Sequence, residues 1–335
     1  LRKELSKVLE TINLDEHPEL AKANKINGKV FHLLTDVNFY SLFPVRGNIN
    51  IGHTAFENEI TEISKKNAKD YDLILGTSNW CKQKMIDAGI KNGDVLIQGI
   101  DPELFYPQDN HHNKNLFIIF SGGKFELRKG QDIVLKAVKI LQDKYNDVVL
   151  VNAWYNYWPE TMVSMKLSRF INFELRGKDW QEYMLNLYRI NGLDEKRIFT
   201  LPIIPNEKLR DLYHKTDIGL FPNRCEGGTN LVLMEYMACG KPAIASFNTG
   251  QKDVLTDWSS FPLKKMSDFK IHDNAKQLIS EWSEPDLDEV VSALEYAYFH
   301  RDEIKKVGAN AAEHMKKFTW KNTADNLLKF LVTLE

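Results

Sequence analysis

The sequence predicts an α/β protein of two domains, each built on a parallel β-sheet with helices on both faces. Short, continuously apolar runs alternate with helical patterns along most of the chain. Strands of this kind are typical of parallel sheets that are buried on both faces. A length of 335 residues fits about two domains.

The order of the predicted elements supports this fold class. Four strands are expected in the first third of the chain, at 30–34, 48–51, 72–75 and 94–97. Five more are expected in the remainder, at 116–120, 148–151, 198–201, 218–221 and 242–245. Helical patterns lie between the later strands, at 131–144, 207–215 and 230–238. Parallel neighbours need such crossover helices, because the chain must return to the same edge of the sheet.

A segment with two prolines and a glycine, at 99–107, marks the boundary between the domains. Polar residues follow it at 108–115, and we expect His111 and His112 there to be solvated rather than metal-bound. Thr319 is a candidate N-cap for the last helix. The expected parts are a first domain at 1–107, a second domain at 108–318 and a helix at 319–335 that crosses back to the first domain.

Composition excludes several classes of protein. The net charge of −2 gives no general electrostatic attraction for nucleic acid. No apolar run approaches the roughly 20 residues of a membrane span, which leaves only peripheral membrane contact open. Cys81, Cys225 and Cys239 form no CxxC pair and are odd in number, which favours a reducing, cytoplasmic location without zinc or disulfides.

Two glycines, Gly227 and Gly228, precede the apolar helix at 230–238. Free N–H groups at a helix start favour anions, and residues without side chains let a phosphate come close. Glu235 lies on this helix, which is apolar nearly all round, so we expect its carboxylate to be buried. A buried carboxylate needs a partner, and the hydroxyls of a ribose would serve.

A second candidate ligand site follows the strand at 116–120, where a glycine turn and three cations are expected before the next helix. Lys124 and Lys129 bracket this loop. Cations beside a strand end in an α/β sheet are well placed for a phosphate. The alternative is a solvated basic loop.

Together these segments resemble family 4 glycosyltransferases, which have the GT-B fold, in which two Rossmann-like domains face each other across a cleft. The likeness runs from about residue 48 to the C-terminus. It rests on G-[RK]-x4-K-G at 123–130, E-G-x6-E-A-M-A-C-G-x-P at 226–242, G-[IV]-D-x3-F-x-P at 99–107, F-[ST]-W at 318–320 and the strand at 72–78, which begins D-x-[IV] and ends in Ser.

The resemblance implies a metal-independent, retaining glycosyltransferase that needs no cofactor. Its donor would be a UDP- or GDP-linked sugar, and its acceptor a hydroxyl of a glycan, lipid or small molecule. Glu235 would bind the ribose, Lys124 and Lys129 the diphosphate, and Glu226 the donor sugar. The other implied donor-binding residues are Gly123, Gly227, Gly228, Thr229, Asn230 and Leu231.

The first domain offers two further candidates. His53 follows a strand pattern and a glycine, and a similarly placed histidine in the family contacts the donor sugar. The alternative is a structural histidine. For Glu57 we favour a place at the start of a helix, where negative charge is stabilising, over a place in the cleft. The aromatic run at 154–158 is interpreted as packing or base contact rather than acceptor binding, and 201–205 as the loop near the base.

The sequence departs from the family pattern in two places. Eight residues separate Glu226 from Glu235, where the family has seven, so Glu226 must come from a loop that is longer by one residue. The first domain is expected to be short or incomplete, because the opening strand and glycine-rich loop of the family are not found. These departures keep a non-catalytic sugar-nucleotide-binding subunit open as an alternative. Another GT-B enzyme, such as an epimerase or a phosphorylase, is the enzymatic alternative.

Overall fold

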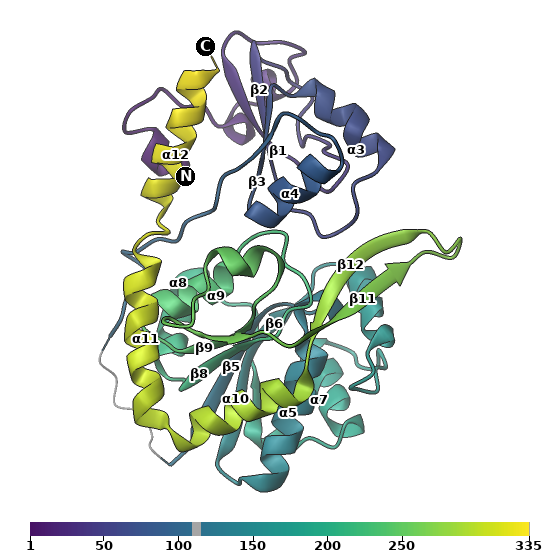
Figure 1. Cartoon of the computed structure of the whole chain (residues 1–335), viewed down its shortest axis with the longest axis vertical. Helices are drawn as coiled ribbons and strands as arrows, with labels where there is room; N and C mark the ends of the chain where they lie inside the picture. Colours follow the sequence, from purple (N-terminus) through teal and green to yellow (C-terminus); the bar gives the residue numbers. More distant parts are fainter. Residues whose placement is uncertain (109–114, 335) are drawn as a thin grey trace.

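The computed structural model describes residues 1–108 and 115–334, so the predicted solvation of His111 and His112 lies outside the described residues. A four-stranded parallel sheet has the order β1-β2-β3-β4, and a six-stranded parallel sheet the order β10-β9-β8-β5-β6-β7 (Figure 1). Two further strands, β11 and β12, form an antiparallel pair. The predicted α/β class with parallel sheets is confirmed.

The strands are short in the first sheet and longer at the centre of the second. The first sheet contains β1 (Lys29–Leu33), β2 (Ile49–Thr54), β3 (Leu73–Gly76) and β4 (Gly93–Val95). The second contains β5 (Phe117–Lys124), β6 (Val148–Tyr155), β7 (Ile198–Thr200), β8 (Ile218–Phe221), β9 (Ala243–Ser246) and β10 (Phe261–Leu263). The antiparallel pair contains β11 (Met266–His272) and β12 (Leu278–Pro285).

Helices connect the strands and cover the sheets. Those of the first part of the chain are α1 (Arg2–Leu5), α2 (Pro18–Ala21), α3 (Glu62–Asn67) and α4 (Asn79–Asp87). Those that follow are α5 (Gln131–Lys144), α6 (Pro159–Met162), α7 (Trp180–Ile190), α8 (Asn206–His214), α9 (Leu231–Ala238), α10 (Leu287–Phe299), α11 (Arg301–Met315) and α12 (Trp320–Thr333). Among the described residues, no helix combines the length and apolar character that crossing a bilayer requires.

The last helix, α12, packs on the first sheet rather than on the second (Figure 1). Leu327 of α12 is buried against Ile51 and Leu75, which come from neighbouring strands of that sheet. The hydroxyl of Thr319 accepts a hydrogen bond from the backbone N–H of Asn322 over 3.2 Å, as its predicted role as N-cap requires. The last helix therefore follows the second domain in the chain but packs against the first.

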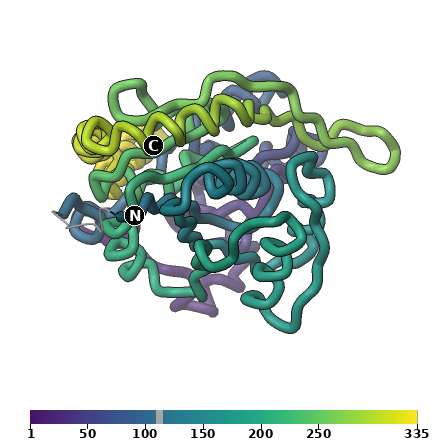
Figure 2. Tube along the Cα trace, turned by 90° about the horizontal axis from the view of Figure 1, so that it is seen from below, coloured from purple at the N-terminus to yellow at the C-terminus, as the bar shows by residue number. Residues whose placement is uncertain are grey.

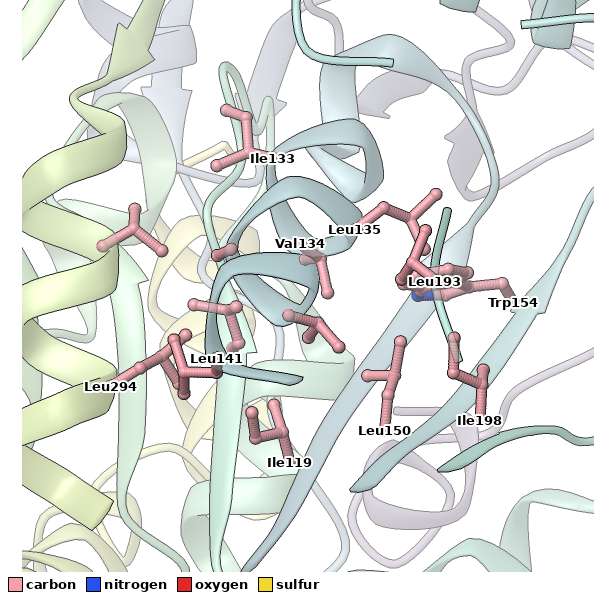
Figure 3. Close-up of a cluster of buried hydrophobic side chains, with 14 of the residues drawn as sticks. Ile119, Ile133, Val134, Leu135, Leu141, Leu150, Trp154, Leu193, Ile198 and Leu294 are labelled. Atoms are coloured by element: carbon pink, nitrogen blue, oxygen red, sulfur yellow. The ribbon is translucent and has the colours of Figure 1, made fainter. Parts of the chain in front are cut away.

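Two apolar clusters sandwich the second sheet, because successive residues of a strand point to opposite faces. Ile119 lies in the cluster beneath α5, α7 and α10, which Figure 3 shows in close-up. Its neighbour Phe120 lies in the opposite cluster, with residues of α8, α9 and α11. The core of the second domain is thus a sheet covered on both faces, as the continuous apolar strands predict.

The strand order of the second sheet reverses between β5 and β8. From β5 the chain proceeds outward through β6 and β7, and then returns to add β8, β9 and β10 on the other side. Ligands of such sheets bind at the carboxyl ends of the strands at this switch point. The loops after Lys124 and after Phe221 leave the sheet at this place.

The β11–β12 hairpin was not predicted and lies outside both parallel sheets. It projects from the second domain in both views (Figures 1 and 2). Its second strand reaches the first domain. The indole Nε1–H of Trp282, in the middle of β12, donates to the carbonyl of Glu57 over 2.8 Å, and the N–H of Glu59 donates to the carbonyl of Ile279, near the turn, over 2.8 Å. The hairpin therefore bridges the two domains.

Candidate functional site

Two loops meet at the switch point of the second sheet. The backbone N–H of Arg224, after β8, donates to the carbonyl of Arg128, after β5, over 2.8 Å. Gly130 begins α5 with φ of 71°, and a Cβ there would lie 2.1 Å from the carbonyl oxygen of Pro222. Only glycine allows both this positive φ and this close approach to Pro222. The second glycine of the G-[RK]-x4-K-G pattern therefore lets the two loops come into contact.

Glu226 is the centre of a cluster of charged side chains. Its Oε1 lies 2.5 Å from Nζ of Lys129, and its Oε2 lies 3.2 Å from Nη1 of Arg128. The amide of Asn223 donates a further hydrogen bond to Oε1. Glu226 is buried, so these three groups supply the partners that a carboxylate removed from water needs. The structure thus brings the predicted residues Glu226 and Lys129 together.

Glu126 continues the charged cluster on the other side of Arg128. Its Oε1 lies 2.6 Å from Nη2 of Arg128, and its Oε2 lies 3.1 Å from Nζ of Lys124. Burial opposes ionisation of both Glu126 and Arg128, but the opposite charges around them outweigh burial. The pKa of Glu126 is therefore lowered and the pKa of Arg128 is raised. Both groups remain charged at neutral pH.

The glycine pair after Glu226 contacts the first domain. A Cβ on Gly227 would lie 2.4 Å from the carbonyl oxygen of Phe56, and one on Gly228 would lie 3.2 Å from Oγ1 of Thr77. The hydroxyl of Ser78 donates to the carbonyl of Gly227 over 2.6 Å. Because these two glycines have no side chains, residues of the first domain can come close to them in this structure. The space predicted for a phosphate is therefore at least partly taken by the first domain.

The remaining predicted residues lie where the loop becomes α9. Asn230 has φ of 64° and caps the helix, since its Oδ1 accepts from the N–H of Leu233 over 3.4 Å. Thr229 is buried, and Leu231 is the first helical residue. Gly123 lies in β5 rather than in a turn: the strand continues through it to Lys124, which pairs with Tyr155 of β6. The expectation that the strand ends before the glycines is wrong.

Glu235 lies one turn further along α9, buried as expected. Nδ2 of Asn206 donates to its Oε1 over 3.1 Å, and the hydroxyl of Tyr213 donates to its Oε2 over 3.4 Å. Burial raises the pKa of Glu235 to about 7, which these two hydrogen bonds only partly offset. Asn206 directly follows the segment 201–205, in which Ile203 is exposed.

His53 does not join the charged cluster. Its ring is buried in the first domain, 5.4 Å from the ring of Phe31, and its Nε2 lies 3.4 Å from the carbonyl oxygen of Leu96. Burial lowers the pKa of His53 to about 4, although the bond to Leu96 opposes this shift. His53 thus lies in a buried, packed environment, which is the kind of place expected for a structural histidine.

Glu57 corrects a sequence-based expectation. It does not start a helix: α3 begins at Glu62, with Thr61 as its N-cap. Instead Oε1 of Glu57 lies 3.1 Å from Nη1 of Arg128 and accepts from the N–H of Gly227 over 3.2 Å. A carboxylate of the first domain thus reaches the charged cluster of the second.

The aromatic run at 154–158 is only partly packed in the core. Trp154 is buried and donates from Nε1 to the hydroxyl of Ser121 over 3.2 Å. Tyr157 and Trp158 are 66% and 55% exposed, so packing does not account for them. Nζ of Lys124 lies 4.8 Å from the ring centroid of Trp158, which places an exposed aromatic ring at the edge of the charged cluster.

Sequence reasoning assigns no individual role to three residues of the site, Arg128, Glu126 and Asn206, and it marks Asn223, just before Glu226, only as a residue that could point at the donor. A signal existed for the first two, because charges of both signs alternate along Lys124, Glu126, Arg128 and Lys129. Such a run predicts mutual pairing as readily as phosphate binding. Asn206 carries no local signal, because its partner Glu235 lies on another helix, whereas Asn223 bonds to Glu226 three residues along the same loop.

The model of the family described as glycosyl transferases group 1 matches residues 103–289, more than half of the chain. An uncharacterised glycosyltransferase of Methanocaldococcus jannaschii is 26% identical over 253 residues, which cover 74% of this chain and 56% of the relative. The chain spans about half the length of the curated relatives it matches.

Solved structures of glycosyltransferases show the same fold. Sucrose-phosphate synthase from Thermosynechococcus elongatus superposes with a TM-score of 0.61 at 16% identity, covering 86% of this chain and 68% of that one. The Anabaena protein HepE in complex with UDP gives a TM-score of 0.60 at 16% identity, covering 85% and 72%.

Two parallel-sheet units, joined through loops at the switch point of the second, define a protein of the GT-B class. The sequence match is more specific than the fold. The chain belongs to the family of glycosyl transferases group 1.

Proposed function

We propose that this protein is a retaining glycosyltransferase that moves a sugar from a nucleotide diphosphate sugar to a hydroxyl group of an acceptor. One observation carries the proposal. Three cations, Lys124, Arg128 and Lys129, lie together with Glu226 where the strand order of the second sheet reverses. This is the place where an α/β sheet binds a nucleotide.

The cations suit the chemistry of the leaving group. A diphosphate gains negative charge as the bond to the sugar breaks, and fixed positive charges stabilise that change most where water is excluded. Arg128 and Lys129 are largely buried, with 14% of each side chain exposed. We propose that these cations act in place of a divalent metal ion, and that the acceptor hydroxyl attacks from the face that the diphosphate leaves.

We assign the nucleoside to the surroundings of Glu235 in α9, the helix that follows the loop of Glu226. Glu235 is a buried carboxylate whose hydrogen-bond partners, Asn206 and Tyr213, leave acceptor capacity on both oxygens. Ribose hydroxyls are donors that such a carboxylate would accept. The exposed Ile203 offers an apolar contact for the base beside Asn206. UDP is the first nucleotide to test, because the HepE structure was determined with UDP.

Calorimetric titration with UDP and GDP tests the nucleotide assignment. We expect one of the two to bind, and we expect the corresponding sugar nucleotides to be hydrolysed slowly without an acceptor. Release of the nucleotide is then measured across a panel of UDP- and GDP-linked sugars. Binding without turnover of any donor would contradict an enzyme and favour a non-catalytic sugar-nucleotide-binding subunit. No binding of either nucleotide would contradict the donor class itself.

A further inference from the structure

The carboxylate of Glu57 lies where two groups of the second domain favour an anion. One is the guanidinium of Arg128, whose Nη1 lies 3.1 Å from Oε1 of Glu57. The other is the backbone N–H of Gly227, which donates to the same oxygen over 3.2 Å. A cation and a loop N–H that converge on one oxygen atom form an anion-binding arrangement. The anion found there belongs to the first domain.

We propose that Arg128 and the N–H of Gly227 form an anion subsite for a phosphate group of the donor, and that Glu57 competes for it. The inference rests on the proposed function, which identifies the ligand as a diphosphate. It adds Glu57, a residue of the first domain, to the donor site. It also gives Arg128 a role in binding the phosphate, in addition to its role in pairing the buried carboxylates. A phosphate oxygen replaces the Glu57 oxygen at both donors.

Charge balance explains why one carboxylate must leave. The cluster contains three cations, Lys124, Arg128 and Lys129, and three carboxylates, Glu57, Glu126 and Glu226. A diphosphate that entered this largely buried cluster would add negative charge without new cations, at a high electrostatic cost. Departure of one carboxylate removes part of this excess negative charge.

Glu57 is the carboxylate that is able to leave. Glu126 and Glu226 belong to the same two loops as the cations, whereas Glu57 comes from the first domain. The hairpin holds Glu57 from the other side: Trp282 donates to the carbonyl of Glu57, and the hydroxyl of Ser280 donates to Oδ1 of Asn58 over 2.9 Å. These contacts involve the backbone carbonyl of Glu57 and the side chain of Asn58, and not the carboxylate of Glu57. That carboxylate can therefore turn away while both contacts remain.

The test compares Glu57→Gln with wild type in binding of inorganic pyrophosphate, UDP and uridine by calorimetry. The Gln side chain keeps the shape and removes the competing charge. We expect pyrophosphate and UDP to bind about tenfold more tightly to the variant, the gain from freeing a site that is otherwise about 90% occupied. Uridine, which has no phosphate, should bind equally to both proteins. Glu57→Asp, whose shorter side chain withdraws the carboxylate, should change affinity in the same direction.

Glu59→Gln is the matched control, because Glu59 lies two residues away and pairs with Lys84 over 2.7 Å outside the cluster. It should leave all three affinities unchanged. Unchanged or weaker pyrophosphate binding by folded Glu57→Gln, with UDP binding intact, would overturn the subsite and leave the proposed function standing. Tighter pyrophosphate binding in a protein that binds neither UDP nor GDP would support the subsite and contradict the proposed function.

Discussion

Asn206, the first residue of α8, donates a hydrogen bond over 3.1 Å to the carboxylate of Glu235 in the middle of α9. The contact joins two helices that lie on the same face of the second sheet, and it fixes the orientation of a buried acid. Glu235 keeps acceptor capacity beyond its bonds to Asn206 and Tyr213, as the proposed contact with ribose hydroxyls requires. We therefore interpret the pair as part of a nucleoside site.

The ribose assignment makes a prediction that uses a modified ligand. Wild type should bind UDP more tightly than 2′,3′-dideoxy-UDP, because only UDP offers hydroxyls to Glu235. In Glu235→Ala the difference should disappear, with UDP affinity reduced about tenfold or more. Calorimetry of both ligands with both proteins gives the interaction energy directly. A preference for UDP that survives in the folded variant would place the ribose elsewhere.

The raised pKa of Glu235 predicts how stability depends on pH. Since this pKa, about 7, lies above the ordinary value of 4.5, the folded protein binds more protons than the unfolded chain between these pH values. The contribution of Glu235 to stability therefore falls as pH rises through this window. Relative to Glu235→Gln, wild type should lose at most about 3 kcal/mol between pH 4.5 and pH 8. Urea unfolding of both proteins at pH 5 and pH 8 checks this, and an identical difference at both pH values would contradict it.

Local patterns were sufficient for the fold class and for the loops of the site. Apolar periodicity located every strand of the two parallel sheets except β10, because burial on both faces leaves a continuous apolar run. It placed the end of β5 too early, at Phe120. The strand runs on to Lys124 because β6 also runs on to Tyr155, and paired strands set each other's length.

Contacts between distant segments explain what sequence patterns did not predict. Glu57 has no local feature that points to Arg128, and two of the three carboxylate partners of Arg128, Glu57 and Glu226, come from distant segments. The β11 strand alternates half-buried and exposed residues around Phe269, so it lacks the continuous apolar run of the other strands. His53 was placed by analogy, and the packing of Phe31 against it decides its position instead.

Lys129 should matter for turnover, because its charge is proposed to stabilise the leaving diphosphate. Lys129→Ala should lower kcat for donor hydrolysis by a factor on the order of 10² to 10³, the size of effect seen when a fixed donor at a developing charge is removed. Lys129→Arg should retain part of the activity. The control is Lys136→Ala, an exposed position on α5. Rates near those of wild type for Lys129→Ala would point to a different phosphate clamp.

Arg224 should matter for stability rather than for chemistry. Its fully buried guanidinium lies 2.7 Å from Asp132 and 2.6 Å from Glu284, and it donates to the carbonyl of Leu127 over 2.7 Å. Arg224→Met leaves two buried carboxylates without this cation, so we expect a loss of about 3–5 kcal/mol in the free energy of unfolding. Arg169→Met is the matched control: Arg169 pairs with the same Glu284 but is 66% exposed, so its loss should cost less than about 1 kcal/mol. Equal losses in urea unfolding would refute the distinction.

The two glycines after Glu226 should differ in their tolerance of a methyl group. In Gly227→Ala the new Cβ would lie 2.4 Å from the backbone carbonyl oxygen of Phe56, so the first domain must move away. In Gly228→Ala it would lie 3.2 Å from Oγ1 of Thr77, and a small shift of that side chain relieves the contact. Overpacking at the first position should cost about 1–3 kcal/mol of interface energy, and less at the second.

Hydrogen exchange provides the readout for this pair. Gly227→Ala should lose protection at residues 56–59 and 279–282, because the backbone bond between Glu59 and Ile279 spans the same interface. Gly228→Ala should resemble wild type in both segments. Exchange that rises equally in the two variants would mean that the loop itself, rather than its contact with Phe56, had changed. Exchange that rises in neither would mean that this contact does not hold the domains together.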